Sequence, residues 1–155
     1  MSYIPEGGSV LSPYLILDDA NAAIDFYIAA FGAEEKVRMN IPGSDKIMHA
    51  EIAIGGATIM LSQENPTCNM VSPKTLGNSP VSIFIYVPDV DTAHAQALTA
   101  GATELYPVAD MFWGDRMGSV TCPFGYTWSQ ATHVKDPTPE EMEAGAKTMM
   151  EQMGG

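Results

Sequence analysis

His49 and Glu51 are the clearest candidates for acid–base chemistry in this chain of 155 residues. One residue separates them in segment 47–54, whose apolar pattern predicts a strand, so both side chains should point to one face. A histidine and a glutamate side by side can move protons to and from a bound molecule. The pair could equally face solvent, or form an ion pair with Arg116 or Lys46.

A tight turn at Gly55–Gly56 predicts how the neighbouring strand pairs with this segment. With a two-residue loop, Glu51 lies opposite Met60 of segment 57–62, and His49 and Met60 share its face. If this face lines a cavity, an apolar surface there would make the carboxylate a stronger base.

Trp113 and Arg116 belong to a predicted loop over 111–116, and loops on rigid scaffolds often carry binding groups. Trp113 could stack on a flat or cationic ligand, and Arg116 could hold a carboxylate or phosphonate. Alternatively, Trp113 covers an edge of the core while Arg116 pairs with Asp115 or Glu51.

The remaining histidines and the two cysteines give weaker signals. His94 lies in a predicted helix, where a surface or half-buried position is expected. His133 ends a predicted strand and could lie at the mouth of the cavity. Cys68 and Cys122 show neither disulfide nor metal-ligand spacing, so nucleophilic catalysis has little support.

The charge balance limits the classes of partner. The chain has seven basic and 19 acidic residues, a net charge of −12. This charge disfavours binding to nucleic acids and to anionic membranes. No apolar run approaches the roughly 18 residues of a membrane span, and the first residues do not resemble a signal peptide. We therefore expect a cytoplasmic protein.

The elements that must position these residues follow a repeated pattern. Apolar periodicity predicts a strand, a helix and three strands in residues 9–63, and the same order in residues 81–135. Segment 64–80, rich in Pro, Asn, Ser and Thr, is predicted to be a linker. The strands are expected over 10–17, 34–41, 47–54 and 57–62, then over 81–87, 103–108, 118–122 and 126–134.

Helix and turn signals recur at a nearly constant offset between the two halves. Asp19 and Asp89, 70 residues apart, can each begin a helix. Gly32 and Gly101, 69 residues apart, can each end one. Gly56 and Gly125, also 69 residues apart, each belong to a predicted turn. A unit that cannot bury its own sheet face must pair with a second copy. The prediction is a single α+β domain over residues 1–155, built from two modules.

A separate C-terminal helix is predicted over residues 138–153. Thr138 can cap it, and Pro139 suits its first position. One stripe of this helix is rich in methionine: Met142, Ala146, Met149, Met150 and Met153. We expect this stripe to dock on its own domain, or alternatively on a partner subunit.

An ordered series of short motifs resembles a known family. The motifs are Asp25-Phe26-Tyr27, Ala30-Phe31-Gly32-Ala33, Met48-His49-Ala50-Glu51, Gly114-Asp115-Arg116-Met117-Gly118, Pro123-Phe124-Gly125 and Ala131-Thr132-His133. Together they resemble the PhnB-like branch of the glyoxalase/bleomycin-resistance (vicinal oxygen chelate) superfamily, often labelled 3-demethylubiquinone methyltransferase-like. The resemblance implies tandem βαβββ modules that form a curved mixed sheet around a cavity, and a homodimer. The methyltransferase label has little support, because no Gly-rich cofactor loop follows a strand.

The resemblance also implies where a metal would sit. Enzymes of this superfamily usually bind a divalent ion through four His or Glu side chains, and carrying the pattern over places Ser12, Met60, Ser82 and Ser129 at those positions. Thioether and hydroxyl groups bind such ions poorly, so we expect no metal of this type and no other cofactor. The three positions Met60, Ser82 and Ser129, together with Tyr14 on the same face as Ser12, are instead expected to line the ligand cavity.

Three functions stay open at this point. The first is a metal-independent enzyme, similar to an isomerase or lyase, with Glu51 as base and His49 assisting. The second is a bleomycin-type resistance protein that sequesters an antibiotic without catalysis, which the net charge of −12 and Trp113 would suit. The third is a metal held by unconventional ligands such as His49, Glu51 and His133.

Overall fold

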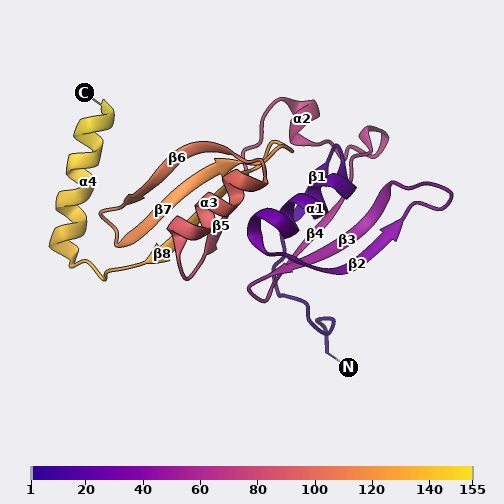
Figure 1. Ribbon diagram of the computed structural model, residues 1–155, viewed down its shortest axis with the longest axis horizontal. Coiled ribbons are helices and arrows are strands. Elements are labelled where there is room, and N and C mark those ends of the chain that lie inside the picture. Colours follow the sequence, from indigo (N-terminus) through magenta and orange to yellow (C-terminus); the bar gives the residue numbers. More distant parts are fainter. Residues whose placement is uncertain (1, 155) are drawn as a thin grey trace.

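The computed structural model describes residues 2–154 as two four-stranded sheets with helices on one side of them (Figure 1). The strand orders are β1-β4-β3-β2 and β5-β8-β7-β6, with a parallel outer pair in each sheet and antiparallel pairs elsewhere. The first sheet and its helix contain β1 (Tyr14–Leu17), α1 (Ala20–Phe31), β2 (Glu34–Asn40), β3 (Ile47–Ile54) and β4 (Ala57–Gln63). The second sheet and its helix contain β5 (Ser82–Tyr86), α3 (Val90–Ala100), β6 (Thr103–Asp110), β7 (Asp115–Thr121) and β8 (Thr127–His133). We refer to these two groups as the first and second modules.

The helices α1 and α3 begin and end where the sequence predicts. Asp19 accepts a hydrogen bond from the amide of Ala22 (3.0 Å), and Asp89 accepts one from Thr92 (3.2 Å), so each satisfies a free amide of the first turn. Gly32 follows α1 with a φ of 66°, in the left-handed region that favours glycine. The same cap–helix–glycine pattern ends α3 at Gly101.

The core lies between the helices and the sheets and joins the two modules. Phe31 of α1 stacks on Trp128 of β8 with ring centroids 4.3 Å apart, and Tyr27 lies 4.9 Å from the same indole. Tyr126 adds a polar link, because its hydroxyl donates to the carbonyl of Ile16 (3.0 Å) and accepts from the amide of Ile16 (3.1 Å). Residues from both modules therefore share one hydrophobic cluster.

Two predicted strand starts are wrong. The first strand covers Tyr14–Leu17 rather than 10–17; Val10 and Leu11 are each 82% exposed, so burial does not hold them in a sheet. In the second module, β7 begins at Asp115 rather than at residue 118, which shortens the predicted loop and places Arg116 within a strand. The predicted linker contains a 3₁₀ turn, η1 (Pro66–Cys68), and a short helix, α2 (Pro73–Leu76).

The C-terminal helix α4 (Pro139–Gly154) begins as predicted, with a capping box. Thr138 accepts from the amide of Glu141 (3.2 Å), and the Glu141 carboxylate accepts from the amide of Thr138 (2.8 Å). The helix lies at the end of the molecule beyond the second sheet, and none of its described residues is buried (Figure 1). One close contact with the domain is at Gly145, where an added Cβ would collide with Phe112. The expected docking of the methionine stripe on its own domain is therefore wrong for Met150 and Met153, which are 68% and 76% exposed.

Within residues 2–154, no helix combines the length and the apolar character needed to cross a membrane.

Candidate functional site

The sheets have one face covered by α1 and α3 and an opposite face, which we call the open face. Strand alternation separates the two: Leu15, Ile52 and Leu61 are buried on the helix side. Tyr14 and Phe84 point the other way and remain 45% and 47% exposed. The open face is therefore the side on which a ligand can reach strand side chains directly.

Three side chains of the first module meet on the open face. The hydroxyl of Tyr14 lies 3.3 Å from Nδ1 of His49, and Nε2 of His49 lies 3.2 Å from a carboxylate oxygen of Glu51. Tyr14 comes from β1 and the other two from β3, with β4 between them. The register pairs Met60 with both Tyr14 and Glu51, so the hairpin pairing predicted from Gly55–Gly56 is confirmed.

This first polar group can carry a proton along a defined line. When the Glu51 carboxylate accepts from the Nε2 hydrogen of neutral His49, Nδ1 is left to accept from the Tyr14 hydroxyl. The histidine and glutamate side chains are 27% and 30% exposed, so a bound molecule can reach them. Apolar neighbours flank them on β2, where Val37 pairs with Glu51 and Met39 with His49.

A second polar group lies on the same face of the second module. Asp115 accepts from the hydroxyl of Tyr86 (3.0 Å) and contacts Nδ1 of His133 (2.8 Å). The other ring nitrogen of His133 lies 2.9 Å from Asp136, which follows β8. The Asp115 side chain is only 5% exposed, whereas that of His133 is 50% exposed.

Hydrogen bonds and charges within the second polar group shift the pKa values of its members. Burial alone would raise the pKa of Asp115, but hydrogen bonds from His133 and Tyr86 outweigh it and lower that pKa, with Trp113 contributing. The pKa of His133 is raised, first by its hydrogen bond to Asp115 and then by Asp136. The pKa of the Tyr86 hydroxyl is raised by the same carboxylate.

Sequence reasoning missed Asp115 and Tyr86 as members of this group. The register pairs Asp115 directly with His133, so alternation along β7 and β8 gives the two side chains one face. The sequence pattern hides this pairing, because it predicts a loop over residues 111–116. A strand beginning at Asp115 would have revealed it.

Arg116 lies on the other side of the sheet, toward α3. Its guanidinium makes two contacts with Asp91 (2.7 and 2.8 Å) and one with Asp110 (3.1 Å), and these raise its pKa. The partners considered from sequence, Asp115 and Glu51, are not those it contacts. The structure therefore does not bring Arg116 together with the open-face residues.

The four positions at which the resemblance implies metal ligands do not fit a divalent ion. Met60 and Ser129 occupy equivalent places on the open face, opposite Tyr14 and Phe84 respectively, and Ser82 opens β5. Ser129 already shares a hydrogen bond with Ser119 (2.7 Å). Thioether and neutral hydroxyl groups are poor ligands for such metals.

An unconventional set of ligands does not assemble either. His133 contacts Asp115 and Asp136 in the second module, whereas His49 and Glu51 belong to the first. Over residues 2–154, no cluster of three or more His, Cys, Asp or Glu side chains has an arrangement that could hold a metal ion.

The sequence matches the Glyoxalase/Bleomycin resistance protein/Dioxygenase superfamily over residues 10–129. The chain belongs to this superfamily. An uncharacterized protein of Mycobacterium bovis is 44% identical over 138 residues, covering 86% of this chain and 90% of that protein. Among solved structures, TioX from Micromonospora sp. ML1 is 26% identical with a TM-score of 0.64, over 82% of this chain and all of that one.

A PhnB protein from Bacillus cereus shares the fold at 16% identity, with a TM-score of 0.62, over 80% of this chain and 99% of that one. The sequence analysis predicted that this chain has the α+β fold of the superfamily, built from tandem βαβββ modules, and this prediction is confirmed. Hydrogen bonding divides the strands into two sheets rather than one.

Proposed function

We propose that this superfamily member binds a small molecule on its open face and moves a proton on it without a metal, as an isomerase or lyase of the PhnB-like branch. The observation that carries the proposal is the hydrogen-bonded line from Tyr14 through His49 to Glu51. Glu51 is the base and takes up the proton on the carboxylate oxygen that does not contact His49, while His49 assists by donating its Nε2 hydrogen to the other oxygen and holding the carboxylate in place.

The exposure of the two polar groups supports this assignment of roles. Glu51 keeps one carboxylate oxygen outside its contact with His49 and is 30% exposed, so it can reach a carbon acid placed against Val37 and Met39. Asp115, in contrast, is nearly enclosed and holds contacts on both oxygens. The first polar group is the reactive one in this proposal. The ordered motifs and the Bacillus cereus PhnB fold support the branch.

Proton abstraction can be tested before the natural substrate is known. Small ketones, 2-oxo acids and enolisable thioesters are incubated with the protein in D₂O, and exchange of their acidic hydrogens is followed by proton NMR. We expect protein-dependent exchange with at least one compound, and Glu51→Gln to slow it by roughly 100-fold or more, because the amide cannot accept the proton.

The control is Glu143→Gln, which removes one negative charge from an exposed position on α4. It should leave exchange unchanged. Equal exchange rates for wild-type protein and Glu51→Gln would rule out Glu51 as the base.

A second candidate function is sequestration of a bleomycin-type antibiotic without catalysis. Phe84 and Tyr86 are exposed on the open face with ring centroids 5.2 Å apart, and a chain of net charge −12 attracts a cationic glycopeptide. Calorimetric titration with bleomycin should then release or absorb heat. If bleomycin at high micromolar concentration produces no heat while the protein catalyses hydrogen exchange in D₂O, antibiotic sequestration is excluded and the enzymatic function is supported.

A homodimer completes the proposal. Large apolar side chains exposed on the open face are Tyr14, Val37, Met39, Phe84 and Tyr86. A second copy that covers them would turn the open face into the wall of an enclosed cavity, and contiguous apolar patches commonly mark such interfaces. We propose a homodimer on this basis.

A further inference from the structure

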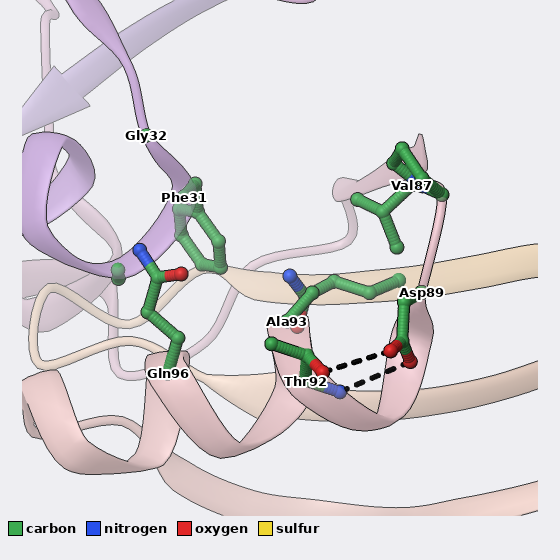
Figure 2. A pocket seen from close by; sticks show the side chains of 10 residues that line it. Phe31, Gly32, Val87, Asp89, Thr92, Ala93 and Gln96 are labelled. Atoms are coloured by element: carbon green, nitrogen blue, oxygen red, sulfur yellow. Dashed lines mark hydrogen bonds between the residues drawn. The ribbon is translucent and has the colours of Figure 1, made fainter.

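A cleft of about 330 Å³ lies on the helix side of the sheets, away from the open face. It is bounded by the end of α1, the segment between β5 and α3, and the first turns of α3. Figure 2 shows Phe31 and Gln96 on one side, with Val87 and Asp89 across from them. The volume falls within the range of small-molecule sites.

Gln130 of β8 lines this cleft and carries an unsatisfied polar atom. The residue is 1% exposed, and its amide oxygen Oε1 is fully buried without a hydrogen-bond partner. Its register partners are Ile85 and Gly118, which places it in the middle of the second sheet beneath α3. A buried carbonyl oxygen without a donor is costly, so a donor brought by a ligand would be favoured there.

Other polar side chains around the cleft already make hydrogen bonds within the protein. The Asp89 carboxylate accepts from the amide and the hydroxyl of Thr92 (3.2 and 2.8 Å), as the dashed lines in Figure 2 show. The Gln96 amide donates to the carbonyl of Ala29 (2.9 Å). The remaining walls are apolar: Ala30, Phe31, Val87, Pro88 and Ala93.

We propose that this cleft binds a small, uncharged aromatic molecule with one O–H or N–H group, which donates to Oε1 of Gln130. The ring lies against Phe31, the large apolar surface of the cleft. A cavity of about 150 Å³ is enough for benzene, so one ring with short substituents fits. The net charge of −12 disfavours an anion. This site is separate from the open face and does not depend on the function proposed there.

Phenol and toluene form a matched pair of probes, because a hydroxyl in one replaces a methyl group in the other. Apolar burial alone favours toluene, the more hydrophobic of the two. Titration followed by ¹H–¹⁵N NMR should show phenol shifting the signals of Gln130, Phe31 and Ala93. The expected dissociation constant is on the order of 1 mM, as befits a ligand of this size. Phenol should bind more tightly than toluene, since only phenol donates to Oε1.

Two variants separate the hydrogen bond from the shape of the cleft. Gln130→Met removes the acceptor at similar volume and should weaken phenol about fivefold while leaving toluene binding equal or stronger. Ala93→Met fills the cleft from α3 and should abolish binding of both probes. Ala95→Met, at an exposed position of the same helix, is the control and should bind both as wild-type protein does.

Three results would overturn the proposal. They are the absence of shifts at Gln130, Phe31 and Ala93 at millimolar phenol, toluene binding as tightly as phenol to wild-type protein, and Ala93→Met binding as well as Ala95→Met. The alanine pair decides the matter even if Gln130→Met does not fold.

Discussion

Both modules place a tyrosine, a histidine and a carboxylate on the open face, yet the two groups differ in what they leave free. Glu51 and His49 are both about a quarter to a third exposed. Asp115 is almost enclosed, with contacts to Tyr86 and His133 on its two oxygens. A carboxylate with satisfied oxygens stabilises its neighbours, whereas one with a free oxygen can act on a ligand.

The second polar group should be visible in the titration of His133. Its raised pKa comes first from Asp115 and second from Asp136, so Asp115→Asn should lower the NMR-measured pKa of His133 toward the usual 6.5. Asp136→Asn should lower it less, since the Asp136 side chain is 99% exposed. An unchanged pKa in Asp115→Asn would contradict the assigned contact.

The same shifts set the sign of a pH dependence of stability. The pKa of His133 is higher in the folded state than in the unfolded state. The contribution of His133 to folding stability is therefore complete below pH 6.5, and it is lost as the pH rises through the raised pKa. The pKa of Asp115 is lower in the folded state. The contribution of Asp115 to folding stability is therefore present above pH 3.8, and it is lost as the pH falls through the lowered pKa. His133→Gln should therefore reduce the fall in Tm between pH 6 and pH 9.

At the scale of elements, the contact between α3 and β7 depends on the absence of a side chain at Gly118. A Cβ atom there would lie 2.9 Å from both Nδ1 of His94 and a methyl carbon of Val108. His94 is itself buried, with Nε2 held 3.0 Å from Glu104. The helix can cover the sheet closely because this strand position is a glycine.

Gly118→Ala should lower the free energy of unfolding by about 1–3 kcal/mol, because the buried ring or the strand must shift to admit the methyl group. Urea denaturation measures the change. Gly154→Ala, where a Cβ would meet no atom within 4 Å, is the control and should change stability little. Equal stability of the two variants would show that α3 adjusts at no cost.

At the scale of the whole molecule, residues 2–154 offer two groups of exposed apolar side chains that a second copy could cover. One is the open face, with Phe84 47% exposed, and the other is the methionine stripe of α4, with Met150 68% exposed. They lie on different parts of the molecule, so single charged substitutions can distinguish which of them a second copy covers.

Light scattering coupled to size exclusion should give twice the chain mass of 16.6 kDa. Phe84→Glu should shift the protein to a monomer, because it places a charge within the apolar face. Met150→Glu should leave the dimer intact. The reverse pattern would assign the interface to α4, and a monomeric wild-type protein would remove the dimer from the proposal.

The sequence by itself determined the local features. Asp19 and Asp89 cap amides within three residues, Gly32 and Gly101 end the helices, and Gly55–Gly56 sets the pairing of Glu51 with Met60. These depend on neighbours close in the chain, so composition and spacing suffice to predict them. The repeat then predicted the two modules.

Only the tertiary structure decided which distant groups meet. The start of β7 at Asp115 set the strand's alternation, and with it the meeting of Asp115 with Tyr86 and the turning of Arg116 toward Asp91. The cleft over Gln130 likewise needs α1 and α3 packed together. Such contacts depend on where strands begin and how helices cover them, which packing across the whole core decides and no local pattern encodes.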